Sequence, residues 1–98
     1  MNKHEAIAIL RSHKADLERL GIVHVALFGS SARGEQNDRS DIDLAVRLNE
    51  GRYMGLMALA EIEQKVGAML GAAVDLVTEP VTAPRLQHQI DRDRIDVF

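Results

Sequence analysis

The sequence predicts a small α/β (α+β) domain in which helices flank one mixed sheet. The chain has 98 residues, which is enough for a single domain spanning 1–98. Hydrophobic residues make up 46% and charged residues 28% of it, as is typical of a globular protein and not of a disordered one. The expected order of elements is helix, strand, loop, strand, helix, strand, which favours helices packed against a sheet.

Residues 2–20 are expected to form one helix, because apolar side chains recur there at intervals of three and four. Asn2 and Glu5 resemble a capping box, and Gly21 stands where a left-handed cap would end the helix. The next segment, 22–28, is apolar except for one histidine and is rich in branched residues. It is therefore predicted to be a central strand covered on both faces.

Residues 41–48 alternate between apolar and mostly polar side chains, the pattern of a second strand. Residues 52–70 carry apolar side chains on one helical face and are followed by Gly71, a helix stop signal. A second long helix is therefore expected over 52–70.

The C-terminal third continues with a short third strand at 73–78. Pro80 and Pro84 bracket a turn, and 84–92 is expected to be a short helix before a weak strand at 94–98.

Composition excludes several classes of protein. Cysteine is absent, so disulfides, thiolate nucleophiles and cysteine-ligated zinc are excluded, and a cytoplasmic location is expected. No apolar run approaches the roughly 20 residues that span a bilayer, so no membrane association is expected. The net charge is −3, the basic residues are scattered and there are three aromatic residues, so direct binding to DNA or long RNA is not expected.

The first chemical signal is a pair of aspartates at the start of the second strand. Asp41 and Asp43 are two residues apart, so both side chains leave the same face, about 6.6 Å apart at roughly 3.3 Å per residue. Two such charges repel by about 4 kcal/mol at 4 Å in an effective dielectric of 20. Oxygen ligation that relieves this repulsion suits Mg²⁺ or Mn²⁺ better than zinc. The alternative is an ordinary strand start whose aspartates bond to the backbone or face water.

The second signal is the compact polar turn that follows the first strand. Gly29 allows the backbone to approach a ligand closely, and the Ser30 hydroxyl adds a donor for anionic oxygens. Arg33 stands one helical turn later, where it could pair with a phosphate. The alternative is a serine-capped short helix with Arg33 on the surface.

Together these residues form the string GSSARGEQNDRSDIDL at 29–44. It resembles the glycine-serine, ten residues, aspartate-x-aspartate signature of polymerase-beta type nucleotidyltransferases. In its ARG and SDIDL details it is most similar to the minimal nucleotidyltransferases, the MNT or MntA-like antitoxins. The resemblance extends over 1–80 through element order, and Asp75 in AVDLV matches the family's third aspartate. The alternative for Asp75 is an edge-strand side chain that faces solvent; residues 81–98 match no catalytic motif.

This resemblance implies a polymerase-beta-like core and a metal-dependent transfer from ATP. Asp41 and Asp43 would hold Mg²⁺ or Mn²⁺, and Asp75 would complete the set as a further ligand or as acceptor of the hydroxyl proton. Gly29 and Ser30 would hold the β- and γ-phosphates, with Arg33 as an additional phosphate contact.

The resemblance also implies a partner. The chain is expected to be a protein adenylyltransferase that acts as the antitoxin of a HEPN/MNT pair, adding AMP to a tyrosine of a HEPN ribonuclease toxin within a hetero-oligomer. One alternative is an antitoxin that covers the toxin without catalysis. The other is nucleotidyl transfer to a small molecule with a partner subunit.

The remaining polar and aromatic residues are expected to be structural. The histidines show no metal spacing; they are His4, His13, His24 and His88. Three methionines follow the spacing of the second long helix and indicate core or interface packing: Met54, Met57 and Met69. Tyr53 is expected to anchor packing, with stacking on a nucleobase as the alternative, and the charged run 91–96 is expected to be a solvated face or a contact with a partner protein.

Overall fold

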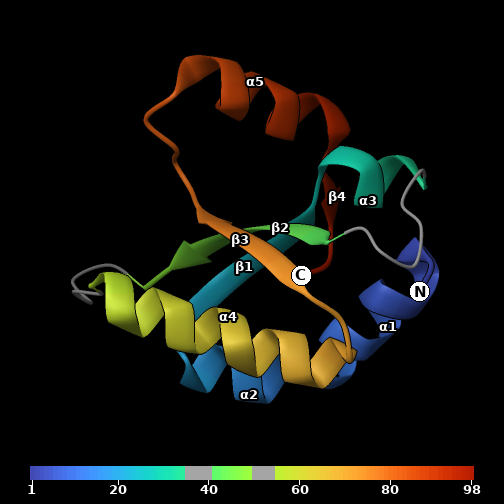
Figure 1. Cartoon of the computed structure of the whole chain (residues 1–98), viewed down its shortest axis with the longest axis vertical. Helices are drawn as coiled ribbons and strands as arrows, with labels where there is room; N and C mark the ends of the chain where they lie inside the picture. Colours follow the sequence, from blue (N-terminus) through green and yellow to red (C-terminus); the bar gives the residue numbers. More distant parts are fainter. Residues whose placement is uncertain (35–40, 50–54) are drawn as a thin grey trace.

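The computed structural model describes residues 1–34, 41–49 and 55–98. Within them a four-stranded mixed sheet has the order β3-β2-β1-β4 and carries helices on both faces, which confirms the predicted architecture (Figure 1). The predicted polar loop 35–40 lies outside the described residues. So does the segment 50–54, which includes Tyr53, Met54 and the predicted start of the second long helix.

The N-terminal segment forms two helices where one was predicted: α1 (Lys3–Ser12) and α2 (Lys14–Arg19). The break lies at His13, because side chains compete there for a helical carbonyl group. The Ser12 hydroxyl donates to the Ile9 carbonyl at 2.6 Å, and His13 Nδ1 lies 3.0 Å from the same oxygen. The predicted N-cap is confirmed, since the Asn2 side chain accepts from the Glu5 amide at 2.8 Å.

The strands are β1 (Ile22–Leu27), β2 (Ile42–Leu48), β3 (Val74–Thr78) and β4 (Ile95–Asp96). β1 pairs antiparallel with both β2 and β4, so its predicted central position is confirmed. It is covered on both faces in its second half, whereas Val23 in its first half is 46% exposed. β2 and β3 run parallel, as expected for strands joined by a helical crossover.

Two apolar clusters lie on opposite faces of the sheet. The larger cluster joins α1, α2 and α4 (Leu56–Leu70) to side chains such as Leu44 and Val46 of β2. The smaller one joins Phe28 and Ala45 to Ile90 of α5 (Pro84–Asp93). Alternation along β2 sends successive side chains into the two clusters, so α5 has a core contact of its own.

The C-terminal half follows the predicted order with three corrections. β4 is shorter than the predicted strand 94–98, although the Val97 amide still donates to the Val25 carbonyl at 2.8 Å. Met57 is 85% exposed, so it lies outside the core, and only the interface alternative remains open for it. The expectation of a solvated face at 91–96 holds for Arg92, whose side chain is 59% exposed, but not for Asp93 at 7% or Arg94 at 25%.

No helix among the described residues is long and apolar enough to cross a lipid bilayer.

Candidate functional site

Two of the three predicted aspartates lie side by side in the sheet. The parallel pairing of β2 and β3 sets Asp43 opposite Asp75, so their side chains leave the same face of neighbouring strands. β3 is an edge strand, and Asp75 is exposed while Asp43 is half-buried. Asp75 therefore faces solvent on an edge strand, as the alternative for this residue stated, but it is also the direct neighbour of Asp43.

The third predicted aspartate, Asp41, interacts electrostatically with Asp43. Asp41 lies immediately before β2 and is exposed. Burial raises the pKa of Asp43, the charges of Asp75 and Asp41 raise it further, and Arg33 opposes these effects. The three carboxylates thus repel one another around Asp43, which is an environment that a cation would stabilise.

The donor set fits a hard divalent cation that keeps open coordination positions. Carboxylate oxygens are the ligands that Mg²⁺ and Mn²⁺ prefer, usually with water and substrate oxygens completing the shell. Among the described side chains no three acidic, histidine or cysteine groups form a ready-made metal cage.

The Gly29 turn packs directly against Asp43. α3 (Gly29–Arg33) begins with Gly29 at φ 63°, in the left-handed region. A Cβ atom at this position would lie 2.8 Å from Oδ2 of Asp43, so a side chain there collides with the carboxylate. The alternative of a serine cap is wrong, because the N-cap of α3 is Phe28 and makes no side-chain cap bond.

Ser31 fixes the backbone of Asp43, a contact that was not predicted from the sequence. Its side chain is buried, and its hydroxyl accepts from the Asp43 amide at 3.0 Å. The Phe28 amide donates to the Asp43 carbonyl at 3.2 Å. Both backbone groups of Asp43, the amide and the carbonyl, therefore bond to the turn.

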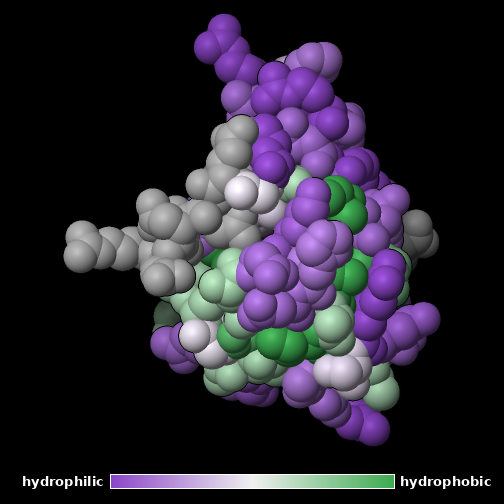
Figure 2. Space-filling view, turned by 90° about the vertical axis from the view of Figure 1, so that its right-hand side faces the viewer, coloured by the Kyte–Doolittle hydropathy of each residue, from purple (hydrophilic) through white to green (hydrophobic). Residues whose placement is uncertain are grey.

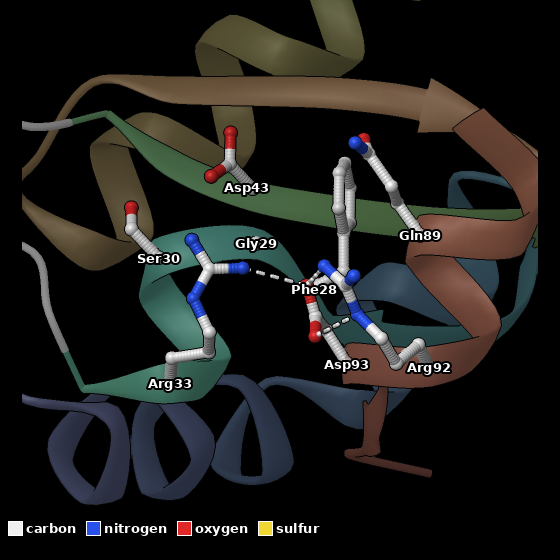
Figure 3. Close-up of a pocket in the computed structure, with 8 residues that line it drawn as sticks. All are labelled: Phe28, Gly29, Ser30, Arg33, Asp43, Gln89, Arg92 and Asp93. Atoms are coloured by element: carbon white, nitrogen blue, oxygen red, sulfur yellow. Dashed lines mark hydrogen bonds and ion pairs between the residues drawn. The ribbon is translucent and has the colours of Figure 1, made fainter. Parts of the chain in front are cut away.

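A cavity of about 490 Å³ opens beside this turn (Figure 3). This volume lies within the range of about 300 to 1,000 Å³ that is typical of small-molecule sites. Its walls come from α3 and its N-cap residue, from β2 and from α5; the lining residues are Phe28, Gly29, Ser30, Arg33, Asp43, Gln89, Arg92 and Asp93. The structure thus brings four predicted site residues to one cavity, whereas Asp41 lines a separate groove beside α4.

The contribution of α5 was not predicted. Arg33 donates to Asp93 at 2.7 Å, and Arg92 donates to the same carboxylate from Nε at 3.1 Å. The hydrogen bond from Arg92 lowers the pKa of Asp93, and the charges of Arg92 and Arg33 lower it further. Arg33 and Asp93 are 60 residues apart, so no local pattern could reveal their contact.

A second ion pair fixes α5 above the sheet. Arg94 donates to both carboxylate oxygens of Glu79 at 3.1 Å, and Gln87 donates to the same carboxylate at 2.8 Å. The Glu79 side chain is 1% exposed. Burial alone would raise the pKa of Glu79, but the hydrogen bonds from Arg94 and Gln87 outweigh it and the pKa is lowered. We refer to Glu79, Gln87 and Arg94 as the α5 clasp.

Sequence comparison finds relatives over most of the chain. The family model described as "Nucleotidyltransferase domain" matches residues 10–96. A Methanocaldococcus jannaschii protein named "Putative protein adenylyltransferase MJ1379" is 38% identical over 91 residues, or 91% of each chain. The "Protein adenylyltransferase MntA" of Thermococcus cleftensis is 40% identical over 74 residues, which are 74% of this chain and 73% of that protein.

Structural comparison gives the same class. A structure described as "Structure of putative minimal nucleotidyltransferase" superposes with a TM-score of 0.78 at 38% identity, covering 97% of this chain and 95% of the other. A second, "Crystal structure of the toxin-antitoxin with AMP-PNP", superposes with a TM-score of 0.70 at 28% identity, covering all of this chain and 73% of the other.

Proposed function

Since the chain belongs to the nucleotidyltransferase domain family and is an enzyme, a minimal nucleotidyltransferase of the polymerase-beta superfamily, we propose its substrate and its partner from this membership. We propose that it transfers AMP from ATP to a tyrosine hydroxyl of a HEPN ribonuclease toxin and thereby acts as the antitoxin of a HEPN/MNT pair. The two proteins would form a hetero-oligomer in the cytoplasm.

One observation carries this proposal: the in-register pair Asp43 and Asp75 stands beside the Gly29 turn and its cavity. A nucleotide polyphosphate and an acceptor hydroxyl must bind next to each other. In this proposal they bind at the half-buried carboxylate of Asp43 and at the exposed carboxylate of Asp75. The cavity side suits the nucleotide. Asp75, on the edge strand, is accessible to a hydroxyl carried by another protein.

The relatives support a protein acceptor. The Thermococcus cleftensis and Methanocaldococcus jannaschii relatives both bear the name protein adenylyltransferase, and the 28% identical structure is a toxin-antitoxin complex with the ATP analogue AMP-PNP. The choice of a HEPN ribonuclease as partner and of a tyrosine as acceptor rests on the resemblance of residues 29–44 to the MNT antitoxins.

The proposed roles of the metal and phosphate ligands follow from the resemblance of residues 29–44 and Asp75 to the family. Asp41 and Asp43 would hold Mg²⁺ or Mn²⁺, which when bound stabilises the charge that develops on the transferred phosphoryl group. The Gly29 turn and the Ser30 hydroxyl would contact the β- and γ-phosphates of ATP. Arg33, on the cavity wall, would add a charged contact to the same phosphates.

The transfer itself is a displacement at the α-phosphorus. The acceptor oxygen forms a bond to phosphorus while the bond between phosphorus and the bridging oxygen to the β-phosphate breaks, so pyrophosphate leaves. The hydroxyl proton must be accepted, and in this proposal the exposed Asp75 carboxylate would accept it if it does not serve as a third metal ligand.

Intact mass spectrometry of a HEPN partner mixed with the protein, ATP and Mg²⁺ tests the proposal. The partner should gain the mass of one or more adenylyl groups with the wild type and with Asp16→Asn, an exposed aspartate of α2, but not with the Asp41→Ala, Asp43→Ala double variant.

Two other outcomes would replace the proposal. A partner that is bound and inhibited without a change in mass, equally well by the double variant, indicates steric neutralisation. A partner that is neither modified nor inhibited, together with labelling of a small hydroxyl compound, indicates transfer to a small molecule.

A further inference from the structure

The wall of the cavity opposite Asp43 is built around a carboxylate that holds two arginines. Asp93 Oδ2 accepts from Arg33 at 2.7 Å and from Arg92 at 3.3 Å, and Oδ1 accepts from Arg92 at 3.1 Å. Figure 3 shows Asp93 between the two guanidinium groups, with all three side chains at the cavity. The Asp93 side chain is 7% exposed, whereas that of Arg92 is 59% exposed.

The geometry of Arg92 indicates that this guanidinium is held at the cavity. Side chains of adjacent residues on a helix point in different directions, so Arg92 must turn back to reach Asp93. Its Nε and one terminal nitrogen are used in that contact, and a guanidinium has five N–H donors. The remaining donors are available to a ligand, and the side chain is both charged and exposed.

The end of α5 that carries these residues is fixed from the other side as well. Arg94, one residue after Asp93, is bound to the nearly buried Glu79 in the α5 clasp. Ile90, one turn earlier, is fully buried against Phe28 and Ala45. Arg92 therefore projects from a turn that is held at two points, which lowers the entropy lost when it binds a ligand.

The charge layout matches a polyphosphate. Two arginines and one aspartate leave a net charge of +1 on one wall, and Asp43 stands on another. On the face shown in Figure 2, the end of the molecule formed by α5 carries mainly hydrophilic side chains. A ligand with several anionic oxygens, which also reaches the aspartates, fits this distribution of charge.

We propose that Arg92 binds the β,γ-phosphates of the nucleotide and that Asp93 is a positioning residue that fixes Arg92 and Arg33 for this contact. The inference rests on the proposed function for the identity of the nucleotide. It adds residues from the segment 81–98, to which the sequence motif assigned no role.

Calorimetric titration with ATP and with AMP, both in Mg²⁺, tests the assignment directly. Arg92→Ala should weaken ATP binding about 10- to 100-fold, the size expected for losing charge-assisted hydrogen bonds, and should leave AMP binding unchanged because AMP lacks the outer phosphates. Arg92→Lys keeps the charge without the planar fork and should restore part of the affinity. Arg85→Ala, an exposed arginine of α5 outside the cavity lining, serves as the matched control.

The variant Asp93→Asn distinguishes a role of Asp93 in positioning the two arginines from a purely electrostatic effect of its charge on ATP. Removing a negative charge beside a polyphosphate should tighten ATP binding if Asp93 acts only through its charge. If Asp93 positions the arginines, ATP binding weakens instead, while circular dichroism shows the fold retained. Tighter binding by Asp93→Asn overturns the positioning role.

The outcomes for the subsite and for the proposed function are distinct. Unchanged ATP affinity in Arg92→Ala, with transfer to the HEPN partner intact in the wild type, overturns the subsite alone. Wild-type ATP binding that depends on Arg92, without any transfer to the partner, overturns the proposed function and leaves the subsite standing. A wild type that binds no ATP overturns both.

Discussion

Replacing Gly29 by alanine should damage both the stability and the activity of the protein. Gly29 has φ 63°, and a left-handed conformation costs a residue with a Cβ atom about 1 to 2 kcal/mol. The new Cβ would also lie 2.8 Å from Oδ2 of Asp43. We expect the free energy of unfolding to fall by about 1 to 2 kcal/mol from the backbone term alone, with any strain at Asp43 added to it.

The collision has a larger consequence for the transfer rate. Ordinary van der Waals contact begins at 3.4 Å, so the carboxylate oxygen must move by about 0.6 Å. Misplacing a catalytic group by about 1 Å can cost roughly 100-fold in rate, so a loss of about 10- to 100-fold is expected for Gly29→Ala.

Gly71 provides a matched control in the same chain. It has φ 67° and nothing within 4 Å of the position of a Cβ atom. Gly71→Ala should therefore show the backbone cost without the collision. Urea denaturation measures the stability of both variants, and the initial rate of AMP transfer to the partner measures their activity. Equal losses of stability together with wild-type rates in both variants would refute the steric role of Gly29.

Three further predictions concern residues around the site. Asp43→Asn should abolish transfer. It should also raise the stability at pH 7 by up to about 1 kcal/mol, because the pKa of Asp43 is raised and its charged form is therefore unfavourable in the folded state. In urea titrations this gain should disappear below pH 3.8, where the carboxyl is protonated in both the folded and the unfolded state. Arg94→Ala leaves the buried Glu79 without its cation and should cost about 3 kcal/mol. Since the pKa of Glu79 is lowered below 4.5, this cost should be complete above that pH and fade as the pH falls through the folded value, and a cost unchanged at pH 2 would contradict the ion-pair account. Ser31→Ala removes the acceptor of the Asp43 amide and should cost about 1 to 3 kcal/mol, together with a reduced transfer rate; thermal melts that match the wild type would show that the bond is dispensable.

The part of the fold that local patterns encode could be predicted from the sequence. The 3.6-residue stripe of α4 is a direct consequence of burying one face, the alternation of β2 reflects the period of a strand, and Gly71 ends α4 in the left-handed conformation that glycine favours. The break at His13 was missed because side-chain bonds to the Ile9 carbonyl override an uninterrupted apolar stripe.

The candidate site divides in the same way. Asp41 and Asp43 lie within one motif, and the polar turn at Gly29 precedes them closely in the sequence. The wall formed by Asp93 depends on contacts between residues 60 apart, and the Glu79–Arg94 pair on a separation of 15. Ion pairs of this kind produce no periodic pattern in the sequence, so the charged run 91–96 could not be distinguished from an ordinary exposed surface by sequence alone.

The pairing of β2 with β3 has a consequence for how the length of the chain can vary. Asp43 and Asp75 are aligned by the hydrogen-bonded ladder between the strands and not by the number of residues that separate them. Insertions in the crossover that contains α4 would therefore leave the two carboxylates together. One residue added between Val74 and Asp75 would move Asp75 to the opposite face of the sheet, away from Asp43. Relatives that keep this chemistry are thus free to differ in the length of the crossover but not in the count of residues within the paired strands.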